Sequence, residues 1–499
     1  MLTRLLFLLA TLLLGCTAPP DPQTLRLGLA NAPVNLDPRF ATDAASARVI
    51  QLLYRDLVEF DAADRPVPGL ADWTNPSPDQ YLFCLRPVAV GRQFSHGRRL
   101  VAEDVRATMA SILDPATASP FRTQLARIRQ MEVVDEDRVR FLLDRPDPLF
   151  PAALALPILP ADLLSSRHPF NRLPVGSGPL RLLEWPQPGR LVLERRVDGQ
   201  RLELVEARDP GVRVMKLLRG EIDLLQGDLP PELFRVLRAR PQVQVIQAPG
   251  SNFTYLGFNL EDPALARLGV RQAIAHAIDR GAIIRYLLGG AARPAQALLR
   301  PEHWAGAPGL AAYAYDPDRS RRLLRAAGYD QQRPLHLEFK TSTDPVRLRL
   351  ATLIQAQLEA AGIQVRVRSL DWGTFYGDVK AGRFQLFSLA WIGVRTPDQF
   401  RYLFHSHSVP PDGANRGRYR NPRVDVLIEQ AESQPSVAEQ APLYRDLQRL
   451  LLADLPYVPL WYEDQVAALR REVGGYRLTP DGRYEGLTTL ARQPRETAH

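Results

Sequence analysis

Cysteine and long apolar runs are scarce in this sequence, and each shortage excludes a class of structure. The 499 residues include two cysteines, Cys16 and Cys84, and Cys16 falls in an N-terminal segment with a separate role. Cys84 alone cannot close an intrachain disulfide. We expect it to be buried as a small hydrophobe in the strand at 81–86, in a fold that depends on its core. The apolar run at 5–14 is too short for a permanent membrane span, so the remaining chain is expected to be soluble.

Lysine is also rare, and the positive charge of the chain is carried by arginine. Lys216, Lys340 and Lys380 are the only lysines among 63 basic residues, and the formal net charge is +8. A solvated, arginine-rich surface is one interpretation, and an anionic ligand or a nearby anionic lipid surface are the functional alternatives. The arginines are spread along the chain rather than gathered on one helix, so no nucleic-acid partner is expected.

Sequence motifs of common catalytic sites are missing. There is no HExxH zinc motif, no paired-carboxylate constellation and no nucleophile elbow, because Val175 replaces the glycine expected two residues before Ser177. The glycines of 176–178 do not make a phosphate loop, because no Lys-Ser/Thr follows and Pro179 blocks a continuing helix. We therefore predict no enzyme activity, no catalytic residue and no cofactor.

Histidine positions give little support for a metal site. His96 stands in a predicted exposed turn without a second His or Cys at ligand spacing. His405 and His407 flank Ser406, and two histidines at this spacing in a loop need a third ligand. No metal site is predicted.

The N-terminal segment has the pattern of an export signal. Residues 1–4 are a short charged start and 5–14 an apolar core. The following Leu13-Leu14-Gly15-Cys16 resembles a lipobox, at which bacterial lipoproteins are cleaved and lipidated on the new N-terminal cysteine. The resemblance implies a signal peptide at 1–16, a lipid on Cys16 that anchors the chain to a membrane outside the cytoplasm, and a proline-rich tether at 17–23.

The length of the chain and its periodic patterns indicate several α/β domains. A chain of 499 residues is too long for one ordinary core. Apolar alternation at 335–339, 363–367 and 384–390 predicts strands, and helical periodicity fills the two intervals between them. Strands that alternate with helices in this way are typical of a parallel sheet with right-handed crossovers.

The stretch 252–280 carries the most specific wording in the chain. It reads as a strand at 252–258 followed by an amphipathic helix whose apolar stripe runs from Val270 to Ile278, with Arg271 and His276 off that stripe. Its YLGFN and VRQAIAHAIDR closely resemble a signature of the extracytoplasmic solute-binding proteins of peptide- and nickel-type ABC transporters (family 5), the dipeptide- and oligopeptide-binding group.

Other passages resemble the same family in collinear order from about residue 25 to 462. They include FSHGRRLVAEDV at 94–105, PVGSGPL at 174–180 and GEIDL at 220–224. The resemblance implies a two-lobed α/β fold of the periplasmic-binding-protein type, with three domains and hinge crossings near Phe253 and Ala467. The implied bounds are 24–47, 175–253 and 468–492 for a discontinuous domain I, 48–174 for an inserted domain II, and 254–467 for domain III.

Two tryptophans mark the predicted ligand site. Trp391 stands at the end of a strand and Trp372 at the start of the preceding helix, where open α/β sheets bind ligands; packing in the core is the alternative for both. In the family, matching tryptophans lie against the ligand, and the loop with Val34 and Asn35 lies at the cleft mouth. The resemblance also implies ligand contacts for the residues that follow Trp391: Ile392, Gly393, Val394 and Arg395.

One departure from the family pattern bears on the solute. Peptide binders of the family carry G-W-x-x-D, whose Asp pairs with the α-amino group of the ligand, and Val394 occupies that Asp position here. A buried ammonium without a partner is costly, and Arg395 adds a positive charge. The sequence therefore predicts an anionic, blocked or otherwise modified solute.

The resemblance implies capture of a solute and its delivery to a separate permease, with no chemistry on the solute. The lobes close on the solute, and the closed form is stabilised by its differential affinity. We expect a monomer. The alternatives are a ligand sensor without a transport role and a hydrolase that uses the cleft between lobes.

Overall fold

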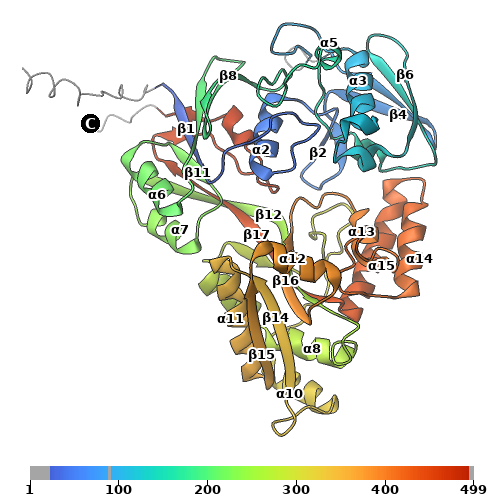
Figure 1. Ribbon diagram of the computed structural model, residues 1–499, viewed down its shortest axis with the longest axis vertical. Coiled ribbons are helices and arrows are strands. Elements are labelled where there is room, and N and C mark those ends of the chain that lie inside the picture. The colour runs from blue at the N-terminus through green and yellow to red at the C-terminus, as the bar shows by residue number, and fades with distance from the viewer. Residues whose placement is uncertain (1–22, 88–91, 494–499) are drawn as a thin grey trace, which may run out of the picture.

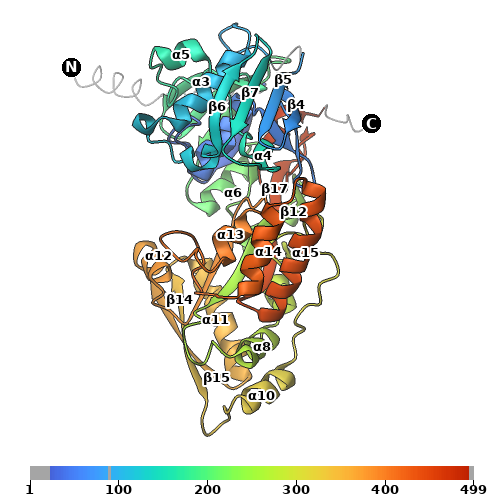
Figure 2. The same ribbon diagram turned by 90° about the vertical axis from the view of Figure 1, so that its right-hand side faces the viewer.

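The computed structural model describes residues 23–87 and 92–493, which form an upper and a lower body joined by two long strands (Figure 1). These strands are β12 (Val243–Phe258) and β17 (Tyr457–Arg470), which pair with each other in antiparallel fashion. They continue from one body into the other (Figure 2). The fold is the predicted two-lobed α/β architecture, and the domain bounds remain predictions.

The part of the upper body next to the N-terminus is built on the main sheet. Its elements are β1 (Leu25–Leu29), α2 (Ala44–Leu53), β8 (Leu180–Gln187), β9 (Arg190–Arg195), β10 (Arg201–Glu206), α6 (Pro210–Arg219), β11 (Leu224–Gln226) and α7 (Pro231–Arg238). β1 is buried along its length and pairs in parallel with β10 on one side and β11 on the other. The main sheet therefore runs without a break from β8, at the top, through β17 and β12 into the lower body.

The second part of the upper body has its own four-stranded sheet and apolar core. Its elements are β2 (Val58–Phe60), β3 (Pro66–Pro68), β4 (Ala71–Ser77), β5 (Gln80–Leu85), α3 (Ala102–Leu113), β6 (Ile128–Val133), β7 (Arg138–Leu143), α4 (Phe150–Ala153) and α5 (Ala161–Ser165). Tyr81, Phe83 and Leu85 fill the core from alternate positions of β5. Cys84 lies on the opposite face and is only half-buried, so the prediction of a buried thiol was wrong because it ignored the alternation of the strand.

The lower body confirms the predicted alternation of strands and helices. Its elements are α8 (Leu268–Ala277), α9 (Arg280–Ala282), β13 (Ala292–Pro294), α10 (Pro317–Ala326), β14 (Leu335–Ser342), α11 (Pro345–Ala360), β15 (Ile363–Leu370), α12 (Trp372–Ala381) and β16 (Leu386–Trp391). β14 pairs in parallel with both β15 and β16, as predicted. β16 then pairs in antiparallel fashion with β12, which makes the sheet mixed.

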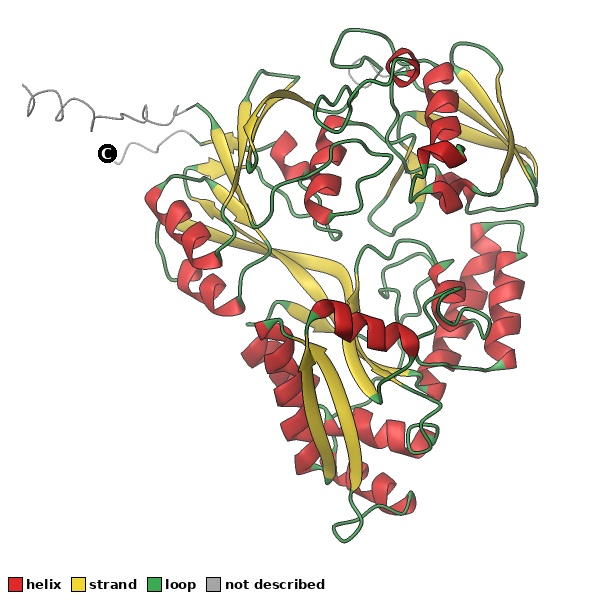
Figure 3. Cartoon of the chain, viewed as in Figure 1, coloured by secondary structure: helices red, strands yellow, loops and turns green. Residues whose placement is uncertain are grey.

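Three helices complete the lower body beside the strands (Figure 3). They are α13 (Gln399–Phe404), α14 (Pro422–Glu432) and α15 (Val437–Asp454), and their apolar faces share a core with residues from β12, β16 and β17. Two short strands, β18 (Val473–Gly474) and β19 (Ala491–Arg492), lie at the C-terminal end of the described chain. Among residues 23–87 and 92–493, no helix is both long and apolar enough to cross a membrane.

The stretch 252–280 forms the predicted strand and helix, with two differences. The strand belongs to the 16-residue β12, whose register with β17 shifts between Ala248 and Asn252. In α8, Arg271 and His276 are buried although they lie off the apolar stripe. Arg271 donates hydrogen bonds to four main-chain carbonyls, including those of Leu455 and Asp454, which compensates the burial of its polar groups.

Candidate ligand-binding site

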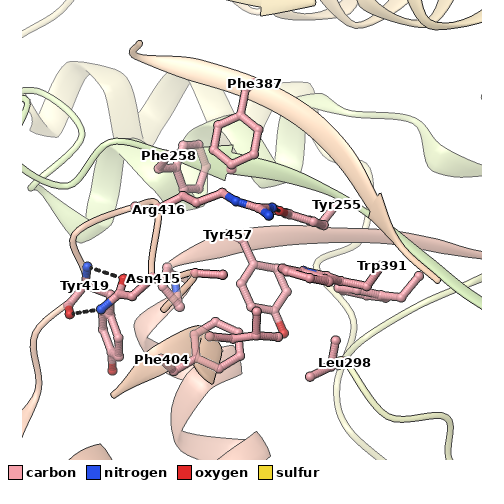
Figure 4. Close-up of a pocket in the computed structure, with 16 residues that line it drawn as sticks. Tyr255, Phe258, Leu298, Phe387, Trp391, Phe404, Asn415, Arg416, Tyr419 and Tyr457 are labelled. Atoms are coloured by element: carbon pink, nitrogen blue, oxygen red, sulfur yellow. Dashed lines mark hydrogen bonds between the residues drawn. The ribbon is translucent and has the colours of Figure 1, made fainter. Parts of the chain in front are cut away.

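A pocket opens in the lower body among β12, β16, β17, α13 and the loop at 414–417 (Figure 4). Its empty volume is about 440 Å³, which includes space open to solvent. Aromatic side chains make most of its wall: Phe253, Tyr255, Phe387, Trp391, Phe404 and Tyr457. An apolar concavity of this size that contains a few polar groups is typical of a site for a small organic ligand.

Strand alternation explains how the aromatic wall is assembled. Phe253 and Tyr255 lie two residues apart on β12, so both rings point to the same face and stack with centroids 5.9 Å apart. Trp391, at the end of β16, stacks on Tyr255 at 6.5 Å with the ring planes 5° apart. Gly257 continues this face, and a Cβ there would meet the Phe387 ring at 2.4 Å. Glycine therefore lets Phe387 close one end of the pocket.

Arg416 places a buried positive charge beside this wall. Its Nη1 donates to the Tyr255 hydroxyl at 3.1 Å, and its Nη2 donates to the Tyr376 hydroxyl of α12, also at 3.1 Å. The guanidinium lies over the Trp391 ring, 4.7 Å from its centroid. Burial raises the pKa of the Tyr255 hydroxyl, and the Arg416 charge acts in the opposite direction.

The two predicted tryptophans occupy different positions. Trp391 lines the pocket, as Figure 4 shows. Trp372 does not line it and is 58% exposed at the start of α12. Its ring stacks on Tyr376 at 5.4 Å with an interplanar angle of 7°. Trp372 is therefore connected to the pocket through Tyr376 and Arg416.

The residues after Trp391 have different environments. Ile392 is 72% exposed, and Gly393 has the positive φ of 69° that favours glycine. Val394 is buried in the apolar core that includes α13, α14 and α15. A valine fits this core, whereas a carboxylate at the same position would have to be paired.

Arg395 already has partners on the facing body. Its guanidinium pairs with Asp481 and lies over the Phe60 ring, 4.9 Å from the centroid. Burial, followed by the charge of Arg483, lowers the pKa of Arg395 to about 10. The Arg395 carbonyl accepts a hydrogen bond from His303 at 2.9 Å. Arg395 therefore contributes to a contact between the two bodies.

Val34 and Asn35 lie on the loop after β1, outside the pocket lining. Their main-chain N–H groups both donate to Ser46 Oγ, at 3.0 and 3.2 Å. This pairing fixes the loop on the start of α2, while the Val34 side chain remains 67% exposed. The structure does not bring these two residues to Trp391.

A polar seam connects the β2–β3 turn of the upper body to the segment 300–304. Arg300 Nη2 donates to Asp64 Oδ2 at 2.5 Å, and both side chains are buried. The main-chain N–H of Trp304 donates to the Ala63 carbonyl at 3.0 Å. Nearby, burial raises the pKa of Asp56 to about 6, against the opposing charge of Arg483. The two bodies thus meet through hydrogen bonds and ion pairs.

Histidines and acidic groups do not converge within the described parts of the chain, where no group of three His, Cys, Asp or Glu side chains could hold a metal ion. His405 Nε2 lies 3.3 Å from Glu429 Oε1, and His405 Nδ1 accepts from the His407 N–H. His96 lies 3.8 Å from Asp162. Cys16 and the rest of the predicted signal peptide at 1–16 lie outside the described residues.

Sequence reasoning singled out Trp391 but missed Arg416 and Tyr255 as neighbours of one pocket. Tyr255 falls within the predicted strand at 252–258, and its alternation with Phe253 was the available signal. Arg416 stands in a loop of an arginine-rich chain, without periodicity to distinguish it. Its position depends on the fold bringing the loop at 414–417 against β12 and α12.

Comparison with known proteins identifies relatives along nearly the whole chain. The model of bacterial extracellular solute-binding proteins, family 5, middle region, matches residues 65–410. The di/tripeptide-binding protein 2 of Pseudomonas aeruginosa is 28% identical, over 92% of this chain and 93% of its own length. The dipeptide-binding protein of Escherichia coli is 26% identical, over 87% of this chain and 88% of its own length.

Solved structures share the fold. The ABC transporter substrate-binding protein CtaP of Listeria monocytogenes superposes with a TM-score of 0.83 and 23% identity, covering 94% of this chain and 99% of that chain. The agreement supports the two-lobed arrangement over almost the full length.

Proposed function

The chain belongs to the bacterial extracellular solute-binding proteins of family 5, and from this premise we propose that it captures a small peptide-like or modified solute and delivers it unchanged to a membrane permease. The relatives named above are binding proteins rather than enzymes. Capture would occur between the lobes, with domain I at 24–47, 175–253 and 468–492, domain II at 48–174 and domain III at 254–467. A lipid on Cys16 would keep the protein at the outer face of a membrane.

The observation that supports this function is the aromatic pocket around Trp391. Family resemblance predicted a ligand against this tryptophan, and Trp391 is stacked on Tyr255 in the wall of a concavity of about 440 Å³. Stacked rings offer a large apolar surface that is already ordered, so little conformational entropy is lost on binding. Trp372, Ile392 and Gly393, which do not line the pocket, remain proposed ligand contacts.

The polar groups of the site favour a solute without a free amino group. Val394 supplies no carboxylate at the position where peptide binders of the family carry Asp. Among the residues that line the pocket, Arg416 is the one with a charged side chain. An ammonium group would therefore be desolvated beside a positive charge, which is unfavourable. A blocked or acidic solute avoids this penalty.

The test is recovery of the natural solute. Protein purified without denaturation is extracted, the solute is identified by mass spectrometry, and its binding to solute-free protein is measured by calorimetry. We expect Trp391→Ala to weaken that binding by about 2 kcal/mol or more, roughly thirtyfold, because a central aromatic contact is lost. Tyr286→Ala, which removes an exposed aromatic ring, is the matched control.

Two results would contradict the proposal. One is a solute whose mass changes on incubation with the protein, which would indicate hydrolysis. The other is equal affinity of the Trp391→Ala and Tyr286→Ala variants for the solute, which would move the site elsewhere.

A further inference from the structure

Arg416 is a buried cation whose protein partners are neutral. Arg416 is 9% exposed, and its two hydrogen-bond acceptors are the hydroxyls of Tyr255 and Tyr376. Within residues 23–87 and 92–493, no Asp or Glu oxygen lies within 4.0 Å of its guanidinium nitrogens. A buried charge is normally compensated by an opposite charge, so the site is electrostatically incomplete.

The remaining hydrogen-bonding capacity of Arg416 is available to a ligand. A guanidinium has five N–H groups, and the two tyrosine hydroxyls take two of them. The other three have no acceptor among the described residues. The plane of the group is held between neighbouring rings, with its central carbon 4.7 Å from the Trp391 centroid and 5.3 Å from the Tyr376 centroid. It is therefore a pre-oriented fork of donors.

Asp454, an acidic group that contacts the lining residue Tyr419, already has partners. Asp454 accepts a hydrogen bond from the Tyr419 hydroxyl and another from the Asn421 amide. Asn415 fixes the loop before Arg416, because its amide donates to the carbonyls of His405 and Tyr419 and its oxygen accepts from the Tyr419 N–H. These bonds hold the loop in place and so fix the position of Arg416.

Resting on the proposed function, we infer that Arg416 receives a carboxylate of the solute, whose apolar or aromatic portion lies against Trp391 and Tyr255. A planar carboxylate matches the fork of a guanidinium and forms charge-assisted hydrogen bonds with it. One positive charge balances one carboxylate, whereas a phosphate monoester would bring close to two negative charges. The sequence predicted an anionic solute partly from Arg395. Because Arg395 is paired with Asp481, Arg416 replaces it as the proposed partner of the anionic group.

The test compares two probes that differ in one charge, N-acetylphenylalanine and its neutral amide, with calorimetry on solute-free protein. We expect the acid to bind wild-type protein at least about tenfold more tightly than the amide, because hydrogen bonds between charged groups are the stronger ones. In Arg416→Met this preference should disappear, and in Arg416→Lys it should be partly retained. Arg420→Met, an exposed arginine of the same loop, should leave the preference unchanged.

A purely structural role of Arg416 predicts different results. If it served only to connect Tyr255 and Tyr376, Arg416→Met would lower the melting temperature of solute-free protein. We expect that temperature to stay equal or to rise, because the variant removes an uncompensated buried charge. Phenyl phosphate serves as a third probe, and tighter binding of phenyl phosphate than of the acid would overturn the assignment of a carboxylate.

The remaining outcomes separate this inference from the proposed function. Equal binding of acid and amide by wild-type protein, or binding of neither, overturns the role of Arg416. If the solute extracted from the native protein then binds but carries no carboxylate, solute capture stands and only the inference fails. If nothing is extracted and no probe binds, both fail.

Discussion

Arg395 and Arg416 are two arginines with different partners, the first half-buried and the second buried. Arg395 follows Trp391 closely in sequence, and this proximity made it the predicted source of positive charge. In the structure, Gly393 has a positive φ, and Arg395 beyond it pairs with Asp481. Arg416 comes from a separate loop and lies over the Trp391 ring. The sequence singled out Trp391, which lines the pocket, but could not show which charged residue lies beside it, because that depends on contacts between distant segments.

Asp56 gives the seam between the two bodies a pH dependence. Its carboxyl faces Arg483, Glu59, Arg395 and Glu485, and burial raises its pKa to about 6. The pKa is raised in the folded state, so the neutral acid is favoured there. The contribution to stability is therefore complete below the unfolded pKa near 4 and is lost as the pH rises through 6.

Replacement of Asp56 by Asn should remove this pH dependence. We expect the free energy of unfolding of Asp56→Asn, relative to wild type, to rise by on the order of 2–3 kcal/mol between pH 4 and pH 7, because Asn stays neutral in the buried site. Denaturant unfolding at both pH values measures it. Asp72→Asn, at an exposed carboxyl, is the control and should show no comparable rise. A constant difference between Asp56→Asn and wild type would contradict the assigned ionisation.

At the scale of elements, local sequence patterns predicted where helices and strands occur better than they predicted which strands pair. The parallel unit of β14, α11, β15, α12 and β16 follows from periodicity and from turn residues such as Asp344, which caps α11. The antiparallel pairing of β16 with β12 joins residues 128 to 138 positions apart, from Phe258 with Leu386 to Phe253 with Trp391, and no local signal encodes it. For the same reason, the strand expected at 252–258 is longer than predicted: it begins at Val243 in β12, because its continuity depends on pairing with β17.

The bulge in β12 depends on Gly250. The register with β17 shifts between Ala248 and Asn252, and a Cβ on Gly250 would lie 2.0 Å from the Glu463 carbonyl oxygen. Because the clash is with main chain of the paired strand, it cannot be relieved by a side-chain rotation. The close approach of β12 and β17 therefore requires glycine at this position.

Gly250→Ala should destabilise the strand pair. We expect a loss of about 1–3 kcal/mol in the free energy of unfolding, because one strand must shift to admit the methyl group. Gly269→Ala is the matched control: a Cβ there meets no atom within 4 Å, and alanine in α8 should be neutral or stabilising by up to about 1 kcal/mol. Denaturant unfolding measures both variants. Equal stability of the two would show that β12 and β17 adjust freely at the bulge.

At the scale of the whole molecule, the same seam that brings the bodies together can control their separation. β12 and β17 are the long strands that continue between the bodies, so opening would rotate one body about these strands (Figure 1). The Asp64–Arg300 pair lies where the β2–β3 turn meets the segment 300–306. That segment is fixed to α15, because Arg445 and Gln448 donate to the carbonyls of residues 304–306.

Breaking this ion pair should favour the open form. An unpaired buried charge costs about 3–5 kcal/mol, but here it can regain water if the bodies separate. Asp64→Asn or Arg300→Met alone should therefore raise the radius of gyration of solute-free protein in small-angle scattering and weaken solute binding, since closure then has to bury a lone charge. The double variant, which leaves no lone charge, should return towards wild type. Asp318→Asn, at an exposed pair with Arg321 within α10, should change neither quantity. The prediction is wrong if the single variants keep the wild-type radius of gyration yet lose several kcal/mol of unfolding free energy. That result would mean that the two bodies form a fixed interface, because bodies that separate expose the lone charge to solvent.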